Sequence, residues 1–324
     1  MKTETTPALA RGIFCHSALE EVFDLSAEDR TLDNLQNLFR REWGRHRRVD
    51  PDDSAYSVLF RDDATKKYNL DEEIEWGTAS IDLLENYYRL EDPSSVPDPN
   101  PLMREMWCHG STALDDDTTV TVRGKIDRID VDVSDKIRMS IIDYKTGKKP
   151  NFKYSCETNE RIANEQFFKM RVYFWMLTKM MENTDGRPTL PGDEEEGQRK
   201  FRLPWILSER IEESLGRKVD RWTDEVELTN LRLMFLSSHV GDRAVEEPGA
   251  ATYLDYPIRR RDEEFAAIDE EIRSLVGDIK RLVDLNDTRA FEHCDWSYCS
   301  CHQLRAGFEP SKVHWTEEAR ELLG

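Results

Sequence analysis

The stretches GKIDRID, residues 124–130, and IIDYKTGK, residues 141–148, predict two adjacent β-strands that bring two aspartates and a lysine together. Asp143 and Lys145 are two residues apart, so in a strand their side chains share one face. Asp127 and Asp143 can hold a divalent cation such as Mg²⁺, with water filling the remaining positions. A lysine beside such a cation can orient the attacking water and stabilise charge on a phosphate. The residues therefore indicate metal-assisted phosphodiester hydrolysis, and the alternative is a hairpin with polar residues on a solvated face.

The full string resembles the catalytic core of RecB-like nucleases, a branch of the PD-(D/E)XK superfamily. The resemblance implies an α/β fold, with a central mixed β-sheet flanked by helices. It also implies that Asp127, Asp143 and the main-chain carbonyl of Tyr144 bind Mg²⁺ or Mn²⁺, and that Lys145 is the catalytic lysine. The implied substrate is DNA, in repair or recombination, with a helicase or another repair protein as a partner.

An N-terminal segment, RGIFCHSALEEVF at residues 11–23, resembles the G-x-x-x-H-x-x-L-E helix of the same family. This resemblance implies that His16 lies at the metal site, as a ligand or as a phosphate contact. A histidine beside apolar residues can instead be an ordinary core group. Glu105 matches, more weakly, an acidic position on the strand before the core motif.

The predicted helix at residues 164–181 resembles the Q-x-x-x-Y helix of the family, and Tyr173 then supports the site. Lys169 stands where glutamine is expected, four residues away and therefore on the same helix face. Lysine cannot accept a hydrogen bond as glutamine can, but it can contact a phosphate, and we expect Lys169, Arg128 and Lys148 to contact DNA. The departure favours a second reading: a nuclease fold without catalysis that binds DNA or joins a complex.

Three cysteines crowd into residues 293–302: Cys294, Cys299 and Cys301. The segment resembles the C-terminal [4Fe–4S] segment of many RecB-like nucleases, although Ser297 stands where a further cysteine is expected. A cluster generally needs four thiolates, and the other cysteines of the chain are Cys15, Cys108 and Cys156. A zinc site completed by His293 or His302 and reduced free thiols are the alternatives.

The chain has 324 residues and a net charge of −20, which argues against a protein that coats nucleic acid. A local basic groove is still compatible with that charge. The best candidate for a phosphate-contacting surface is a basic cluster that could also be an ordinary exposed helix end: Arg40, Arg41, Arg45, Arg47 and Arg48. The sequence has no apolar run of membrane-spanning length and no secretory signal, so we expect an intracellular protein with no membrane partner.

Hydrophobic periodicity predicts helices at residues 11–24, 31–46, 74–90, 164–181 and 265–282. Strands are expected at 104–114, 118–133, 137–145, 231–237 and 251–258. The apolar face of the strand at 118–133 changes near Asp127, which indicates either a bulge or a strand that ends and restarts. We expect one nuclease domain at 1–305 with an insert at about 180–228, uncertainly helical over 201–228, a cysteine segment at 293–302 and a tail at 306–324.

Overall fold

The computed structural model describes residues 5–47, 56–61, 65, 67–96, 103–115, 118–133, 137–182, 211–218, 225–237 and 253–284. The chain divides into two compact units. One comprises Met1–Thr112 and Thr121–Asp269, and the other comprises Ala113–Val120 and Glu270–Gly324. All the described candidate site residues lie in the first unit. Within the described ranges, no helix is long and apolar enough to cross a membrane.

Three N-terminal helices pack on one another, with two short 3₁₀ turns between the first two. In chain order they are α1 (Pro7–Glu21), η1 (Val22–Asp24), η2 (Ala27–Asp29), α2 (Leu32–His46) and α3 (Leu70–Leu90). Each α-helix begins at a polar residue whose side chain accepts a hydrogen bond from a main-chain N–H of the first turn: Thr6, Thr31 and Asn69. The predicted helices are confirmed, and α1 and α3 begin four residues before the predicted positions.

Five strands form one sheet in the order β1-β2-β3-β4-β5. They are β1 (Arg104–Ala113), β2 (Thr119–Val133), β3 (Ile137–Lys145), β4 (Val226–Phe235) and β5 (Tyr253–Pro257). β2 and β3 are antiparallel, β3 and β4 are parallel, and β4 and β5 are antiparallel. Helix α4 (Cys156–Glu182) lies between β3 and β4 in the chain, as a parallel connection requires. The expected mixed sheet with flanking helices is confirmed.

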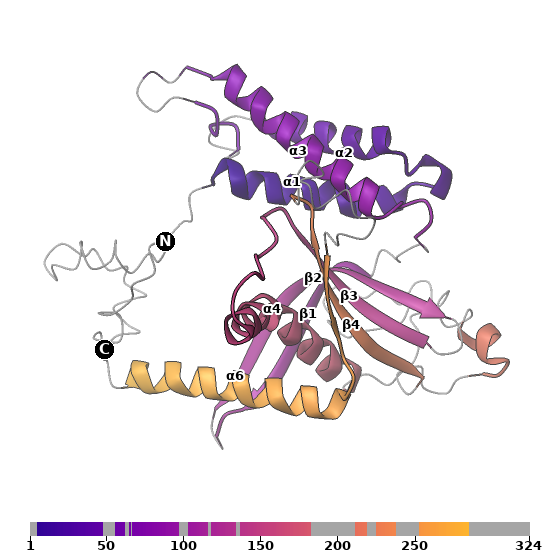
Figure 1. Ribbon diagram of the computed structural model, residues 1–324, viewed down its shortest axis with the longest axis vertical. Coiled ribbons are helices and arrows are strands. Elements are labelled where there is room, and N and C mark those ends of the chain that lie inside the picture. Colours follow the sequence, from indigo (N-terminus) through magenta and orange to yellow (C-terminus); the bar gives the residue numbers. More distant parts are fainter. Residues whose placement is uncertain are drawn as a thin grey trace, which may run out of the picture. The chain divides into compact units, whose positions relative to one another are not determined.

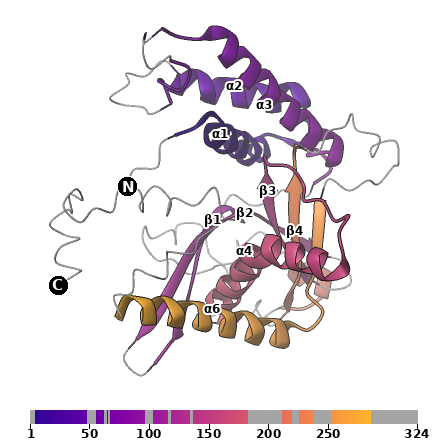
Figure 2. The same ribbon diagram turned by 60° about the vertical axis from the view of Figure 1, so that its left-hand side comes forward.

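The central strand β3 places its two side-chain faces in different surroundings. Ile142 and Tyr144 belong to the apolar core formed with α1, α2 and α3. The alternate residue Asp143 faces α4, where its carboxylate meets Lys169. Figures 1 and 2 show α1, α2 and α3 grouped on one side of the sheet and α4 on the other. Because both faces are covered, most residues of β3 are buried, including the charged Asp143.

The change of face in β2 is confirmed. A Cβ atom at Gly124 would lie 2.8 Å from the Tyr173 ring on α4, whereas Arg128 reaches Tyr87 of α3. Residues four apart in a regular strand share a face, so one irregularity must lie between these two. β2 is nevertheless continuous, so the interpretation that the strand ends and restarts is wrong, and an irregularity such as a bulge fits.

The expectation of helix over 201–228 is wrong at its end, because β4 already begins at Val226. Residues 211–215 are helical, and residues 201–210 and 219–224 lie outside the described part of the chain. The last described helix, α6, spans Arg261–Asp284 and confirms the prediction for that segment.

Candidate active site

His16 joins α1 to the sheet through both nitrogens of its imidazole ring. Buried Phe14 and Cys15 anchor α1, and His16 is left half-buried beside the strands. Its Nε2 lies 3.0 Å from the carbonyl oxygen of Tyr144 on β3, and its Nδ1 lies 3.4 Å from Oδ2 of Asp127 on β2. The main-chain N–H of Tyr144 donates to that same Oδ2 at 2.7 Å. The His16 imidazole, the Asp127 carboxylate and the main chain of Tyr144, all predicted ligands, therefore contact one another.

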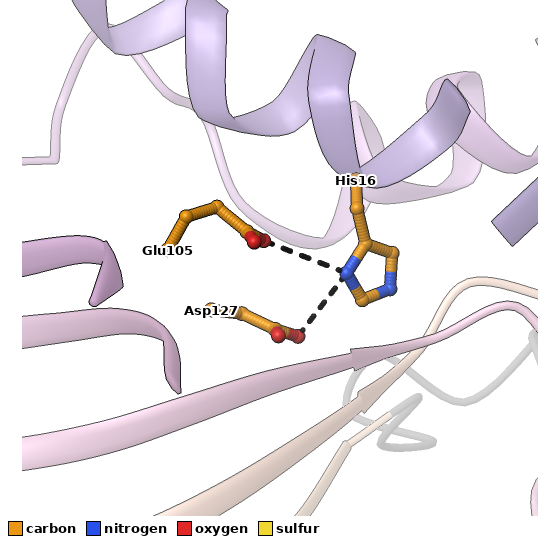
Figure 3. Close-up of side chains that lie close together, drawn as sticks. All are labelled: His16, Glu105 and Asp127. Carbon is orange, nitrogen blue, oxygen red and sulfur yellow. Dashed lines mark ion pairs between the residues drawn. The ribbon is translucent and has the colours of Figure 1, made fainter. Parts of the chain in front are cut away.

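Glu105 on β1 completes this group (Figure 3). Its Oε1 lies 3.9 Å from Nδ1 of His16, and its Oε2 lies 2.5 Å from Nζ of Lys125. Glu105 has φ 48°, an uncommon conformation for a residue other than glycine and one that recurs at functional sites. One donor atom each from His16, Glu105 and Asp127 lie within 4.8 Å of one another. They line a hollow of about 580 Å³ between α1 and the strands.

The charges in this group determine its protonation. Burial lowers the pKa of His16, but the carboxylates of Asp127 and Glu105 outweigh burial and raise that pKa to about 10. Burial raises the pKa of Glu105, but hydrogen bonds to His16 and Lys125 leave it below its ordinary value. The two carboxylates therefore favour the protonated form of His16, with Nε2 beside the Tyr144 carbonyl oxygen and Nδ1 beside the Asp127 carboxylate.

A second group forms around Asp143, whose side chain is only 1% exposed. Its Oδ2 lies 2.6 Å from Nζ of Lys145, and its Oδ1 accepts a hydrogen bond from Nζ of Lys169 at 2.9 Å. The ammonium of Lys169 also lies 5.0 Å from the ring centre of Tyr173, and burial raises the pKa of the Tyr173 phenol to about 12. Asp143, Lys145, Lys169 and Tyr173 are thus brought together.

The donor atoms fit a hard divalent cation. Carboxylate oxygens and a main-chain carbonyl are the ligands that Mg²⁺ and Mn²⁺ favour, and an imidazole nitrogen is also accepted. Oδ2 of Asp143 is buried and lacks an aligned hydrogen-bond donor despite its ion pair with Lys145, so it keeps a lone pair for such an ion. His16, Glu105 and Asp127 would hold the cation, with the Tyr144 carbonyl beside them. When bound, the ion would activate water and stabilise phosphate charge.

The family comparison agrees with this geometry. Residues 1–304 match the family model of the PD-(D/E)XK nuclease superfamily. The chain belongs to this superfamily. No curated protein and no solved structure matched the chain in the corresponding comparisons. The central mixed sheet and its flanking helices are consistent with the fold of this superfamily.

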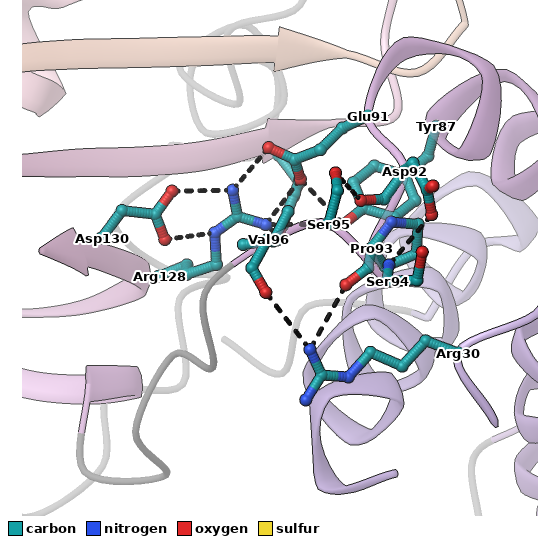
Figure 4. Close-up of polar contacts among 11 residues, drawn as sticks. Arg30, Tyr87, Glu91, Asp92, Pro93, Ser94, Ser95, Val96, Arg128 and Asp130 are labelled. Atoms are coloured by element: carbon teal, nitrogen blue, oxygen red, sulfur yellow. Dashed lines mark hydrogen bonds and ion pairs between the residues drawn. The ribbon is translucent and has the colours of Figure 1, made fainter. Parts of the chain in front are cut away.

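Arg128 was expected to contact DNA, and its surroundings contradict this expectation. Its side chain is 1% exposed, and its guanidinium donates to both carboxylate oxygens of Glu91 at 2.7 and 2.8 Å. It also donates to Asp130 at 2.9 Å and to the Tyr144 hydroxyl at 2.8 Å. Figure 4 shows this arginine enclosed between Glu91 and Asp130. Arg128 is a buried structural group that ties β2 to α3.

The other expected DNA contacts and the basic cluster have different surroundings. Lys148 is exposed just after β3, so its contact with DNA stays a prediction.

The described arginines of the basic cluster bind side chains of the helical layer. Arg40 donates to Asn37 and Gln36, Arg41 and Arg45 pair with glutamates, and Arg47 pairs with Glu73. The alternative of an ordinary exposed helix end fits this pairing better than a surface prepared for phosphates.

The cysteine segment at residues 293–302, with Cys294, Cys299 and Cys301, lies outside the described residues. Of the upstream candidates for a fourth cluster ligand, Cys15 and Cys108 are buried, and burial raises the pKa of each thiol to about 12. Cys156 at the start of α4 is exposed. Thiolates form most readily from accessible groups, and Cys156 is the accessible thiol of these three.

Sequence reasoning gave too little weight to Glu105 and missed Lys125. The signal for Lys125 was its position beside Gly124 and two residues before Asp127, which places it on the same strand as the first aspartate. Glu105 had only its position before the core motif to mark it. The structure brings both to the His16 group through their 2.5 Å ion pair.

Proposed function

We propose that the protein is a metal-dependent DNA nuclease of the RecB-like branch of the PD-(D/E)XK superfamily. The observation that carries the proposal is the convergence of His16, Glu105 and Asp127 beside the Tyr144 carbonyl. A helix-borne histidine at the carboxylate site is what the resemblance to RecB-like nucleases implied. The proposed cofactor is Mg²⁺ or Mn²⁺, because the donor atoms are mostly oxygens.

In this proposal each residue has a defined task. Asp127, Asp143 and His16 bind the metal, with Glu105 as an additional carboxylate ligand. Lys145 orients the attacking water and stabilises the charge on the phosphate, because its ammonium lies beside the proposed metal ligand Asp143 on the same strand. Tyr173 supports the site from α4 through its contact with Lys169.

The wider setting of the proposal rests on sequence resemblance. We propose one nuclease domain over residues 1–305, acting inside the cell in DNA repair or recombination, with a helicase or another repair protein as partner. Three thiols within eight residues support a further metal centre, [4Fe–4S] or zinc, at Cys294, Cys299 and Cys301. Protein purified without oxygen should show iron–sulfur absorbance or stoichiometric zinc. If neither is found, this metal centre is excluded.

The test of nuclease activity is Mn²⁺-dependent degradation of labelled single- and double-stranded DNA. Asp127→Asn and Lys145→Ala should each reduce cleavage by on the order of a hundredfold or more. The matched control is Asp132→Asn, because Asp132 lies on β2 like Asp127 but has an exposed side chain. This variant should cleave DNA like the unmodified protein. Equal cleavage by Lys145→Ala would assign the activity to other residues or to a contaminant.

Calorimetric titration separates metal binding from chemistry. Asp143→Ala should abolish or strongly weaken Mn²⁺ binding, whereas Lys145→Ala should retain it. Equal Mn²⁺ binding by Asp143→Ala and the unmodified protein would contradict the assignment of Asp143 as a ligand.

The alternative function is a nuclease-fold module that binds DNA or a protein complex without cleaving. One observation favours it: both carboxylate oxygens of Asp143 are engaged by lysines. DNA binding with no cleavage of either substrate at any Mn²⁺ concentration would establish this alternative.

A further inference from the structure

The two halves of the candidate site differ in how their charges are balanced. Asp127 and Glu105 share His16, whose Nδ1 lies 3.4 Å and 3.9 Å from their carboxylates, and Glu105 also pairs with Lys125 at 2.5 Å, so two carboxylates face two cations. Asp143 has two, because Lys145 and Lys169 approach separate oxygens at 2.6 and 2.9 Å. The buried carboxylate of Asp143 thus carries an excess of one positive charge around it.

This excess bears directly on metal binding. A divalent cation that approaches Asp143 meets two ammonium groups within ion-pair distance of the carboxylate, and like charges repel at short range in a partly buried site. The donor atoms that already lie within 4.8 Å of one another come from His16, Glu105 and Asp127, and Asp143 is not among them. Asp143 is therefore neutralised by two lysines of the chain itself.

The two lysines differ in how easily their ammonium groups can move away from Asp143. Lys145 lies on the same strand as Asp143 and has a side chain 30% exposed, whereas Lys169 lies on α4 and is 53% exposed. The stem of Lys169 is long and flexible, and its ammonium has the Tyr173 ring on one side. A phosphate anion arriving from solvent can reach Lys169 and pair with it as a point charge.

We propose that Lys169 is an internal cation that occupies Asp143 until a phosphodiester draws it away, so that DNA binding strengthens metal binding. This inference rests on the proposed function and names how its site is regulated. The coupling is reciprocal: the factor by which DNA tightens metal binding equals the factor by which metal tightens DNA binding.

The experiment is calorimetric titration of Mn²⁺ into the full-length protein, alone and with a phosphorothioate oligonucleotide that resists cleavage. Lys169→Gln keeps a polar side chain but removes the charge. It should tighten Mn²⁺ binding in the absence of DNA by on the order of tenfold, the scale on which groups that contact a metal ligand act. The oligonucleotide should tighten Mn²⁺ binding to the unmodified protein but not to Lys169→Gln.

Lys179→Gln is the matched control, because Lys179 lies on the same helix and contacts Asp269, away from the carboxylates of the site. It should bind Mn²⁺ like the unmodified protein. If Lys169→Gln binds Mn²⁺ equally or more weakly, Lys169 does not compete with the metal and the inference is overturned, while the nuclease proposal stands. If neither protein binds Mn²⁺, the proposed function fails and this inference fails with it.

Discussion

Replacement of Arg128 by methionine should destabilise the fold strongly without any direct effect on DNA. Methionine fills a similar volume but leaves Glu91 and Asp130 without their shared cation. Removing one partner of a buried ion pair typically costs about 3–5 kcal/mol, because a charge is left uncompensated. The lost contacts with the Phe23 and Tyr144 rings, 5.2 and 5.7 Å from the guanidinium carbon, act in the same direction.

The destabilisation should depend on pH in a defined way. Burial raises the pKa of Glu91, but the charge and hydrogen bonds of Arg128 leave it below its ordinary value. A carboxylate with a lowered folded-state pKa contributes stability above its unfolded pKa, and that contribution is lost as the pH falls through the folded pKa. At Asp130, burial outweighs the charge of Arg128 and raises the pKa of the carboxyl. Of the two carboxylates, Glu91 is therefore the one that Arg128 keeps charged more strongly. The difference between Arg128→Met and the unmodified protein should be largest near pH 7 and should shrink in acid.

Urea unfolding at pH 7 and in acid measures both effects. The control is Arg89→Met, which removes an exposed ion pair with Glu85 one helical turn away and should cost less than about 1 kcal/mol. An Arg128→Met protein with ordinary stability but weakened DNA binding would refute the structural role of Arg128 and restore it as a DNA contact.

Three other perturbations test separate parts of the structure. Gly110→Ala should lower the free energy of unfolding by about 1–3 kcal/mol, because its Cβ would lie 2.9 Å from two carbons of the buried Trp175 indole. Gly77→Ala meets open space and should raise the free energy of unfolding by up to about 1 kcal/mol. Urea unfolding that gave the reverse order of stability would contradict this packing. Mn²⁺ binding should weaken as the pH falls and should release protons, because His16, with a pKa of about 10, must deprotonate to bind the ion. Calorimetry in buffers of different ionisation enthalpy measures the number of protons released. A pH-independent affinity would exclude His16 as a ligand. Alkylation mapped by mass spectrometry should modify exposed Cys156 long before buried Cys15, and equal rates would contradict the burial.

The strands and the metal group could be predicted because their signals are local. Asp143 and Lys145 are two residues apart, and the motif residues around Asp127 and His16 lie within short segments whose periodicity specifies a strand or a helix. The resemblance of these short segments to RecB-like nucleases therefore indicated most of the residues that the structure brings together.

The errors came from contacts that join distant segments. The burial of Arg128 depends on Glu91 at the end of α3, and an arginine beside an active-site motif gives no local sign of that partner. The position of Glu105 depends on a left-handed backbone conformation that its sequence does not indicate. The double pairing of Asp143 depends on a register between β3 and α4 that periodicity alone does not specify.

The pairing of β3 with β4 also sets the order in which the protein can mature as it is synthesised. The proposed Mg²⁺ or Mn²⁺ ligands have all emerged by residue 144, but β3 pairs with β4 along its whole length, up to Lys145 opposite Phe235. Until β4 emerges, β3 has an open edge, and the strand that holds Asp143 lacks one of its two neighbours. A chain that ends before β4 therefore contains every proposed Mg²⁺ or Mn²⁺ ligand without the complete sheet that aligns them. Under the proposed function, we expect such a partial chain not to cleave DNA.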